Sequence, residues 1–293
     1  ASISTFDYFK KDKLFSKNDK PAFNQKDERF LKLKVALPFL SSKRLELGFG
    51  IAQIEDRYFQ NNVIDFDKDK YDKSGYRLFG GSVSFNGSTL NSRQFPIQGA
   101  REALVAQIFT GNESFRPGVN SENKKPVKEK HSWLQLSYMK EKYHKMGANW
   151  ILGWYLDAVY ASKNFSENYT ATMMQASEFA PTAHSKLTYN EAFRANQYVA
   201  AGIRPIYRLN QMFHVRGEFY GFLPIFPIER NSINKAYYGK AFSRFEYLGE
   251  ISVVCQLPFG AISAYVNHYS SPRREWNVGL TLGWQLFNYR FIE

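Results

Sequence analysis

Charged side chains are the residues of this chain whose types and positions could support chemistry. Four acids and three arginines fall on the polar side of segments in which polar and apolar residues alternate: Asp157, Glu218, Glu246, Glu250, Arg204, Arg208 and Arg216. Carboxylates brought together on one face can serve as general acid and base. Carboxylates interleaved with arginines instead form charge-assisted pairs. We therefore interpret this set as a structural charge network.

The spacing of the other candidates supports neither metal chemistry nor nucleophilic catalysis. The chain has five histidines and one cysteine: His131, His144, His184, His214, His268 and Cys255. No two of them have metal-ligand spacing, so we expect no metal and no cofactor. A serine nucleophile needs Gly-x-Ser-x-Gly at a strand-to-helix turn. The nearest string, Gly80-Gly-Ser-Val-Ser84, lacks the last glycine and lies in a strand pattern, so we expect no catalytic residue here.

Strict alternation is clearest in the last third of the chain. Over residues 276–287 the even positions are apolar, and the odd positions as far as 285 are small or polar. Residues 247–257 and 262–266 also alternate. Because a strand turns successive side chains to opposite faces, each segment predicts a strand with one apolar face.

Two folds use such strands. A soluble sandwich buries the apolar face against a second sheet, whereas a membrane barrel turns it to lipid. Trp276 and Trp284 stand near opposite ends of one apolar face. Their separation, about 27 Å at the rise of a strand, is close to the height between the aromatic girdles of a barrel. This placement favours the barrel, and a soluble β-sandwich binding module is the alternative.

Composition is compatible with the barrel. The 293 residues are 17% aromatic, the mean hydropathy is −0.45 and the net charge is +12. No run of about 18 apolar residues predicts a membrane helix. The lysines gather in expected loops, near 68–73 and 124–130, and no nucleic-acid motif appears, so we expect no nucleic-acid partner. For a barrel, the positive charge would attract anionic outer-leaflet lipid.

About eleven segments have the strand pattern. Short turns, as at 41–43, contrast with long polar loops at about 60–75 and 111–130. Short turns at one end and long loops at the other are typical of outer-membrane barrels. Alternation is lost between 161 and 197, and a loop of this length is uncommon unless it is functional.

Several separated blocks resemble one family. The three longest are Asn168-Tyr-Thr-Ala-Thr-Met-Met, Phe179-Ala-Pro-Thr-Ala-His-Ser-Lys186 and Phe193-Arg-Ala-Asn-Gln-Tyr198 with the following Val-Ala-Ala-Gly202. Shorter ones are Thr89-Leu-Asn-Ser-Arg-Gln-Phe95, Gly111-Asn-Glu, Asn234-Lys-Ala-Tyr-Tyr-Gly-Lys240 and the ending Leu286-Phe-Asn-Tyr-Arg. From about residue 30 onward, this order of blocks is similar to the C-terminal barrel of patatin-like phospholipases of the Bacteroidota outer membrane.

The resemblance implies an all-β fold, an Omp85-type antiparallel transmembrane barrel of about sixteen strands, of which eleven or twelve lie in this chain. It also implies that loop 161–197 folds into the lumen and carries an Arg motif. Phe193, Arg194 and Ala195 match that motif, with Ala in place of the usual Gly. The arginine would pair with an acid on a nearby strand. Glu218 is the expected partner, and Glu246 and Glu250 are alternatives.

We expect residues 1–293 to form a single barrel domain. The chain begins without Met or signal peptide, so we expect a processed chain or a piece of a longer protein. The resemblance places the hydrolase and POTRA-type modules of the family upstream. The expected function is to anchor, and serve as conduit for, a patatin-like phospholipase in the bacterial outer membrane, with a Ser-Asp dyad upstream of Ala1.

The alternative function is a barrel for protein assembly or secretion. Expected partners are outer-membrane lipid and lipopolysaccharide and a client or passenger domain. The sequence does not predict an oligomeric state.

Overall fold

The computed structural model describes residues 2–8, 24–59, 71–119, 121–258, 260–271, 276–283 and 291–292. Twelve strands form one antiparallel sheet in which each strand pairs with its neighbours in the chain. The strands are β1 (Ser2–Tyr8), β2 (Asn24–Leu40), β3 (Lys43–Tyr58), β4 (Asp72–Ser88), β5 (Gly99–Arg116), β6 (Val127–Lys145), β7 (Trp150–Ala161), β10 (Gln197–Arg208), β11 (Phe213–Pro224), β14 (Glu246–Leu257), β15 (Gly260–Tyr269) and β16 (Trp276–Gly283). The described residues do not form a β-sandwich, because these twelve strands belong to one sheet.

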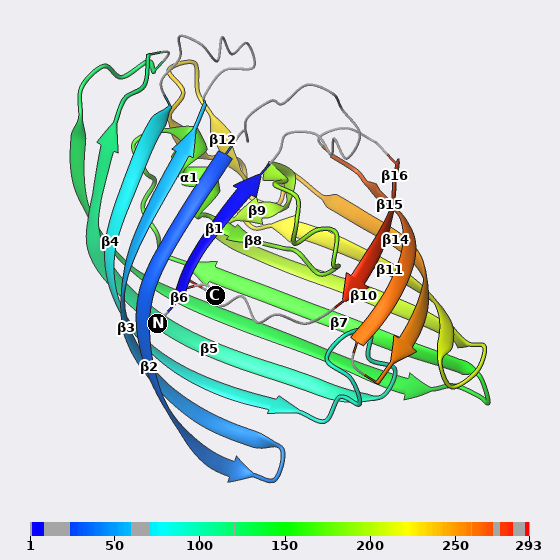
Figure 1. The fold of residues 1–293 in the computed structure, drawn as a ribbon. Helices are drawn as coiled ribbons and strands as arrows, with labels where there is room; N and C mark the ends of the chain where they lie inside the picture. The colour runs from blue at the N-terminus through cyan, green and yellow to red at the C-terminus, as the bar shows by residue number, and fades with distance from the viewer. Residues whose placement is uncertain are drawn as a thin grey trace.

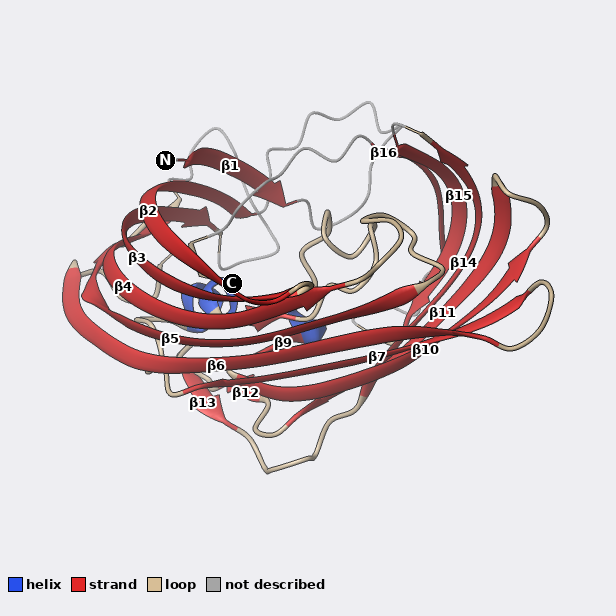
Figure 2. Cartoon of the chain, turned by 90° about the horizontal axis from the view of Figure 1, so that it is seen from below, coloured by secondary structure: helices blue, strands red, loops and turns tan. Residues whose placement is uncertain are grey.

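The sheet curls strongly, and its concave side encloses the segment between β7 and β10 (Figures 1 and 2). That segment contains helix α1 (Tyr169–Gln175) and the short strands β8 (Ser177–Glu178) and β9 (Arg194–Ala195), which pair with each other. A second small ladder, β12 (Ile228–Arg230) with β13 (Ala236–Tyr238), lies between β11 and β14. Among the described strands, β1 and β16 are the two edges of the large sheet.

The two faces of the sheet differ in chemistry as the alternation predicted. On β11, Phe213 and Phe219 are exposed on the outer face, whereas Arg216 and Glu218 are buried on the inner face. The outer face of β16 is apolar and highly exposed, with Leu280 77% accessible. Exposed apolar side chains in such number suit a lipid environment better than water.

The connections also sort into two groups. Residues 162–196 and 225–245 lie at one end of the sheet, which we call the loop end. Residues 41–42, 146–149 and 209–212 lie at the opposite end, which we call the turn end. Within the described ranges, no helix is long and apolar enough to cross a bilayer.

Several strands extend further toward the loop end than the alternation predicted. β3 continues to Tyr58, beyond the alternating residues 45–52, and β4 begins at Asp72, inside the loop expected at about 60–75. β5 and β6 likewise take up both ends of the loop expected at 111–130. Here the outward side chains are polar, so the apolar signal ends while the hydrogen-bonded ladder continues. Trp284, part of the girdle argument, lies outside the described residues.

Candidate functional site

The enclosed segment, residues 162–196, begins and ends at the same point of the wall. Ala161 N donates to Asn196 O at 2.8 Å, so β7 and β10 stay adjacent where the segment departs. Helix α1 is buried over nearly its whole length. Asn168 begins the helix because its Oδ1 accepts a hydrogen bond from Ala171 N at 2.9 Å. The helix was not predicted, although Asn168 is a favourable residue for a helix start.

The expected motif, Phe193, Arg194 and Ala195, lies at the centre of this segment and is buried. Arg194 Nη2 lies 2.9 Å from Glu178 Oε2, and the two residues are direct partners in the β8–β9 ladder. Glu178 is thus an ion-pair partner of Arg194, whereas Glu218, the expected partner, pairs with Arg216. Because Glu178 belongs to the same segment, the pair holds the segment together.

Arg194 also stabilises the end of the helix. Its Nη1 donates to the carbonyl oxygens of Met173, Met174 and Ala176, each at 3.4 Å. A guanidinium at a helix C-terminus satisfies carbonyls that have no partner within the helix and matches the sign of the helix dipole. The guanidinium lies 4.7 Å from the centre of the Tyr189 ring, a cation–π distance. One side chain thus joins the helix, β8 and the strand that leads to β10.

Polar bonds attach the segment to β3 and β4. Gln175 Nε2 donates to Asp56, and Asn168 Nδ2 donates to Tyr58 OH at 2.7 Å. Tyr76 OH and Ser166 Oγ are 2.9 Å apart. All these groups are buried, so the hydrogen bonds form without competition from water.

Lys163 contributes a buried amine to the same side. Its Nζ lies 4.5 Å above the Trp133 ring and 3.4 Å from Gln175 O. Burial, reinforced by the charge of Lys26, lowers the pKa of Lys163 to about 7. The amine therefore changes charge in the physiological range.

The opposite wall holds the segment mainly through aromatic packing. The Phe179 ring stacks on Phe222 at 5.7 Å and meets Tyr220 at 5.9 Å, within one buried cluster. His184 Nδ1 and Tyr269 OH are 2.8 Å apart. The segment therefore spans the concave side from β3 and β4 to β11 and β15.

A second set of charges lies nearer the turn end, and we call it the arginine network: Glu141, Tyr143, Arg204, Arg216, Glu218 and Tyr220. Glu218 accepts from Arg216 and from Tyr220 OH, the latter at 2.6 Å. Arg204 pairs with Glu141 and donates to Tyr220 OH at 2.7 Å. Arg216 Nη1 reaches the carbonyl of Pro96 at 2.8 Å, which ties the connection between β4 and β5 into the network.

The other charged residues of the predicted set are also hydrogen-bonded. Glu246 accepts from Arg244 at 2.7 Å, Glu250 accepts from Asn267 at 3.3 Å and Asp157 accepts from Tyr155 at 3.3 Å. Arg208, half-buried at the turn end, donates to a backbone carbonyl. The arrangement is that of a structural charge network.

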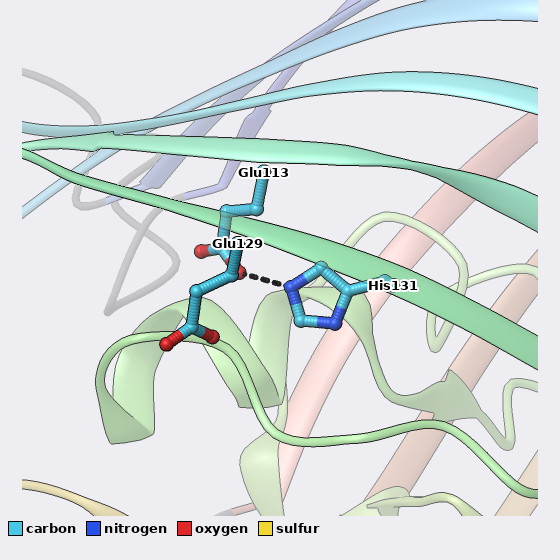
Figure 3. A group of neighbouring side chains, drawn as sticks. All are labelled: Glu113, Glu129 and His131. Carbon is cyan, nitrogen blue, oxygen red and sulfur yellow. Dashed lines mark hydrogen bonds and ion pairs between the residues drawn. The ribbon is translucent and has the colours of Figure 1, made fainter.

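One cluster has the composition of a metal site (Figure 3). Ligand atoms of Glu113, Glu129 and His131 lie within 4.8 Å of one another. Glu113 and Glu129 are direct cross-strand partners, a relation that sequence spacing does not reveal. His131 Nε2 is 2.8 Å from Glu113 Oε2, while Tyr76 OH donates to the other oxygen at 3.1 Å. A cation bound at Nε2 would have to displace this contact with Glu113.

Comparisons with known proteins support the fold. No family model and no curated protein matches the sequence. Among solved structures, BamA from Haemophilus ducreyi lacking POTRA domains 1–3 matches with a TM-score of 0.56 at 11% identity, over 87% of this chain and 53% of that one. The chain thus spans about half the length of the BamA chain it matches.

Two autotransporter domains match more weakly. The AIDA-I transport unit of Escherichia coli has a TM-score of 0.41 at 12% identity, over 87% of this chain and 80% of that one. The Bordetella BrkA β domain has a TM-score of 0.39 at 9% identity, over 95% of this chain and 92% of that one. From the topology and the BamA match, the chain has an all-β fold, an antiparallel sheet of the β-barrel type.

Proposed function

We propose that this chain is the membrane-embedded barrel of a larger Omp85-type protein in the bacterial outer membrane. The observation that carries the proposal is the contrast between the two faces of the sheet. Apolar side chains such as Ile251 and Leu280 are exposed outside, and paired charges such as Arg216 and Glu218 are buried inside. Outer-membrane barrels have this distribution, with long loops outside the cell and short turns in the periplasm. The loop end would then be extracellular.

We propose further that the barrel anchors, and serves as conduit for, a patatin-like lipid hydrolase encoded upstream. The resemblance of several sequence blocks to that family supports this reading, and 162–196 includes three of those blocks in whole or part. The barrel would hold the hydrolase at the membrane that contains its phospholipid substrate. This chain would anchor the hydrolase and would contribute no catalytic residue.

The test compares the native protein with this chain alone. The native protein, purified from outer membranes in detergent, should hydrolyse phosphatidylethanolamine vesicles, and residues 1–293 refolded in the same detergent should not. Alkylphosphonate labelling should mark a serine upstream of Ala1. A native protein that neither hydrolyses lipid nor takes the label would exclude the hydrolase while leaving the barrel unaffected.

The second candidate is a barrel that assembles or secretes client proteins, favoured by the similarity to the BamA fold. Depletion of the protein in cells distinguishes the two. Loss of other barrel proteins from the outer membrane would support assembly. Unchanged barrel levels with altered phospholipid turnover would support the hydrolase.

A further inference from the structure

A single row of polar side chains crosses the outer face of five strands, β2 to β6. Its members are register partners from each strand to the next and are all exposed: Arg29, Gln53, Arg77, Asn112 and Lys130. We call them the cationic row. Three carry positive charge, two are amides and none is an acid. With neighbouring strands about 4.8 Å apart, successive cations are about 10 Å apart with an amide between them.

The charge of this row is not neutralised by the described residues around it. None of Arg29, Arg77 and Lys130 forms an ion pair with another residue that the structure describes. On the same face, one register step toward the loop end, the acids are Asp27 and Glu55. Both are already paired with Arg57 Nη2, at 3.2 Å and 2.7 Å.

An apolar row lies one register step toward the turn end. Leu31, Ile51 and Phe79 are 46%, 51% and 47% exposed and are partners across β2, β3 and β4. The two rows line one open depression of about 820 Å³. A second depression, of about 710 Å³, adjoins it toward the loop end. Its lining adds the cations Lys73, Arg116 and Lys128 and the acids Glu55, Glu113 and Glu129. The surface therefore changes from apolar to cationic within about 7 Å along the strands.

We propose that this depression binds a phosphorylated anionic lipid of the outer leaflet. Its phosphate would lie on the cationic row, and its acyl chains would lie along Leu31, Ile51 and Phe79. Arginine forks and amides are donors suited to phosphate oxygens, and arginine binds them in pairs. An acidic peptide or nucleic acid would leave the apolar half unused. The inference rests on the membrane location proposed above, which sets the cationic row at the level of the extracellular headgroups.

The test uses the refolded chain in zwitterionic detergent micelles and counts bound lipids by native mass spectrometry. Dioleoyl phosphatidic acid is compared with dioleoyl phosphatidylcholine at equal mole fraction, and inorganic phosphate is added as a competitor. The variant is Arg77→Gln with Lys130→Gln. The matched control is Lys142→Gln with Lys145→Gln, which removes the same charge from exposed lysines near the turn end of β6.

We expect the wild-type chain and the control to bind one phosphatidic acid in preference to phosphatidylcholine. The double variant should bind it roughly 30-fold more weakly, from about 1 kcal/mol for each lost cation. Equal weakening by the control would show attraction by net charge alone and would overturn the site. Complete displacement by millimolar phosphate would show a free-anion site and would overturn the lipid assignment.

A separate measurement distinguishes this inference from the proposed location. If the chain does not insert into phosphatidylcholine vesicles, the membrane location fails. If it inserts and shows no preference for phosphatidic acid, the location survives and the lipid site fails.

Discussion

Arg194 and Glu178 stand directly opposite each other in the β8–β9 ladder, with 2.9 Å between Nη2 and Oε2. Both side chains are buried, and Arg194 in addition caps the C-terminus of α1. Arg194 therefore joins helix α1, β8 and β9 within the enclosed segment.

Replacing Arg194 should destabilise that segment strongly. Arg194→Ala leaves the Glu178 carboxylate and several helix carbonyls without their donor, and breaking a buried pair costs about 3–5 kcal/mol. Arg194→Lys should recover little, because an ammonium lacks the planar fork that reaches both groups. Limited proteolysis within 162–196 should be fast in both variants while the strands stay protected. Wild-type protease resistance in Arg194→Ala would contradict this role.

Removing the segment should open the lumen. Because Ala161 and Asn196 are hydrogen-bonded, residues 163–195 can be replaced by a short Gly-Ser linker without separating β7 from β10. The shortened barrel should give large steady conductance in planar bilayers, and the intact chain should give little. Equal conductance from both chains would mean that the segment does not block the passage.

A charged side chain introduced on the outer face should lower the free energy of unfolding, and more so the deeper its position lies in the membrane. Leu280→Arg should lower the free energy of unfolding by about 2–4 kcal/mol if this position is at mid-membrane. Gln53→Arg, in the cationic row, should cost roughly 0–1 kcal/mol because it lies at headgroup level. Urea unfolding in phospholipid vesicles, followed by tryptophan fluorescence, measures both. Similar costs at the two positions would contradict the assigned depths.

Lys163 should make stability rise with pH above neutrality. Burial lowers its pKa from 10.5 to about 7. Below pH 7 the folded and unfolded chains both keep the proton, so the penalty for burying the charge is complete. Between pH 7 and 10.5 the unfolded chain binds more protons, so stability increases with pH.

The matched variant isolates this effect. Lys163→Met should stabilise the protein most at pH 6, and the gain should shrink toward pH 10. Urea unfolding at pH 6, 8 and 10 measures the difference between the two chains. Parallel pH profiles for the two chains would show that Lys163 is not the group responsible.

The sequence was sufficient to predict which side chains of each strand face inward and which face outward. This prediction needs only the alternation of neighbouring residues within the strand. It placed Glu218, Glu246 and Glu250 on the inner side, where the structure buries them. It underestimated strand length toward the loop end, where polar residues point outward and the period has no apolar signal.

Contacts between residues that are far apart in the chain could not be predicted from the sequence. Glu178 and Arg194 meet only because the segment between them doubles back, and no periodicity reports this. The grouping of Glu113, Glu129 and His131 likewise depends on the register of β5 and β6. The cationic row is visible only once the registers of five strands are known. The domain boundaries and the upstream hydrolase remain predictions.

The central claim, that this chain is the membrane barrel of a larger outer-membrane protein, is tested most directly by the intact mass of the native protein. The protein would be isolated from outer membranes and its N-terminal part mapped by peptides. We predict a mass far above the 34.0 kDa of this chain, with Gly-x-Ser-x-Gly among the additional peptides. A mature protein of 34.0 kDa that begins at Ala1, or recovery only from the soluble fraction, would contradict the claim.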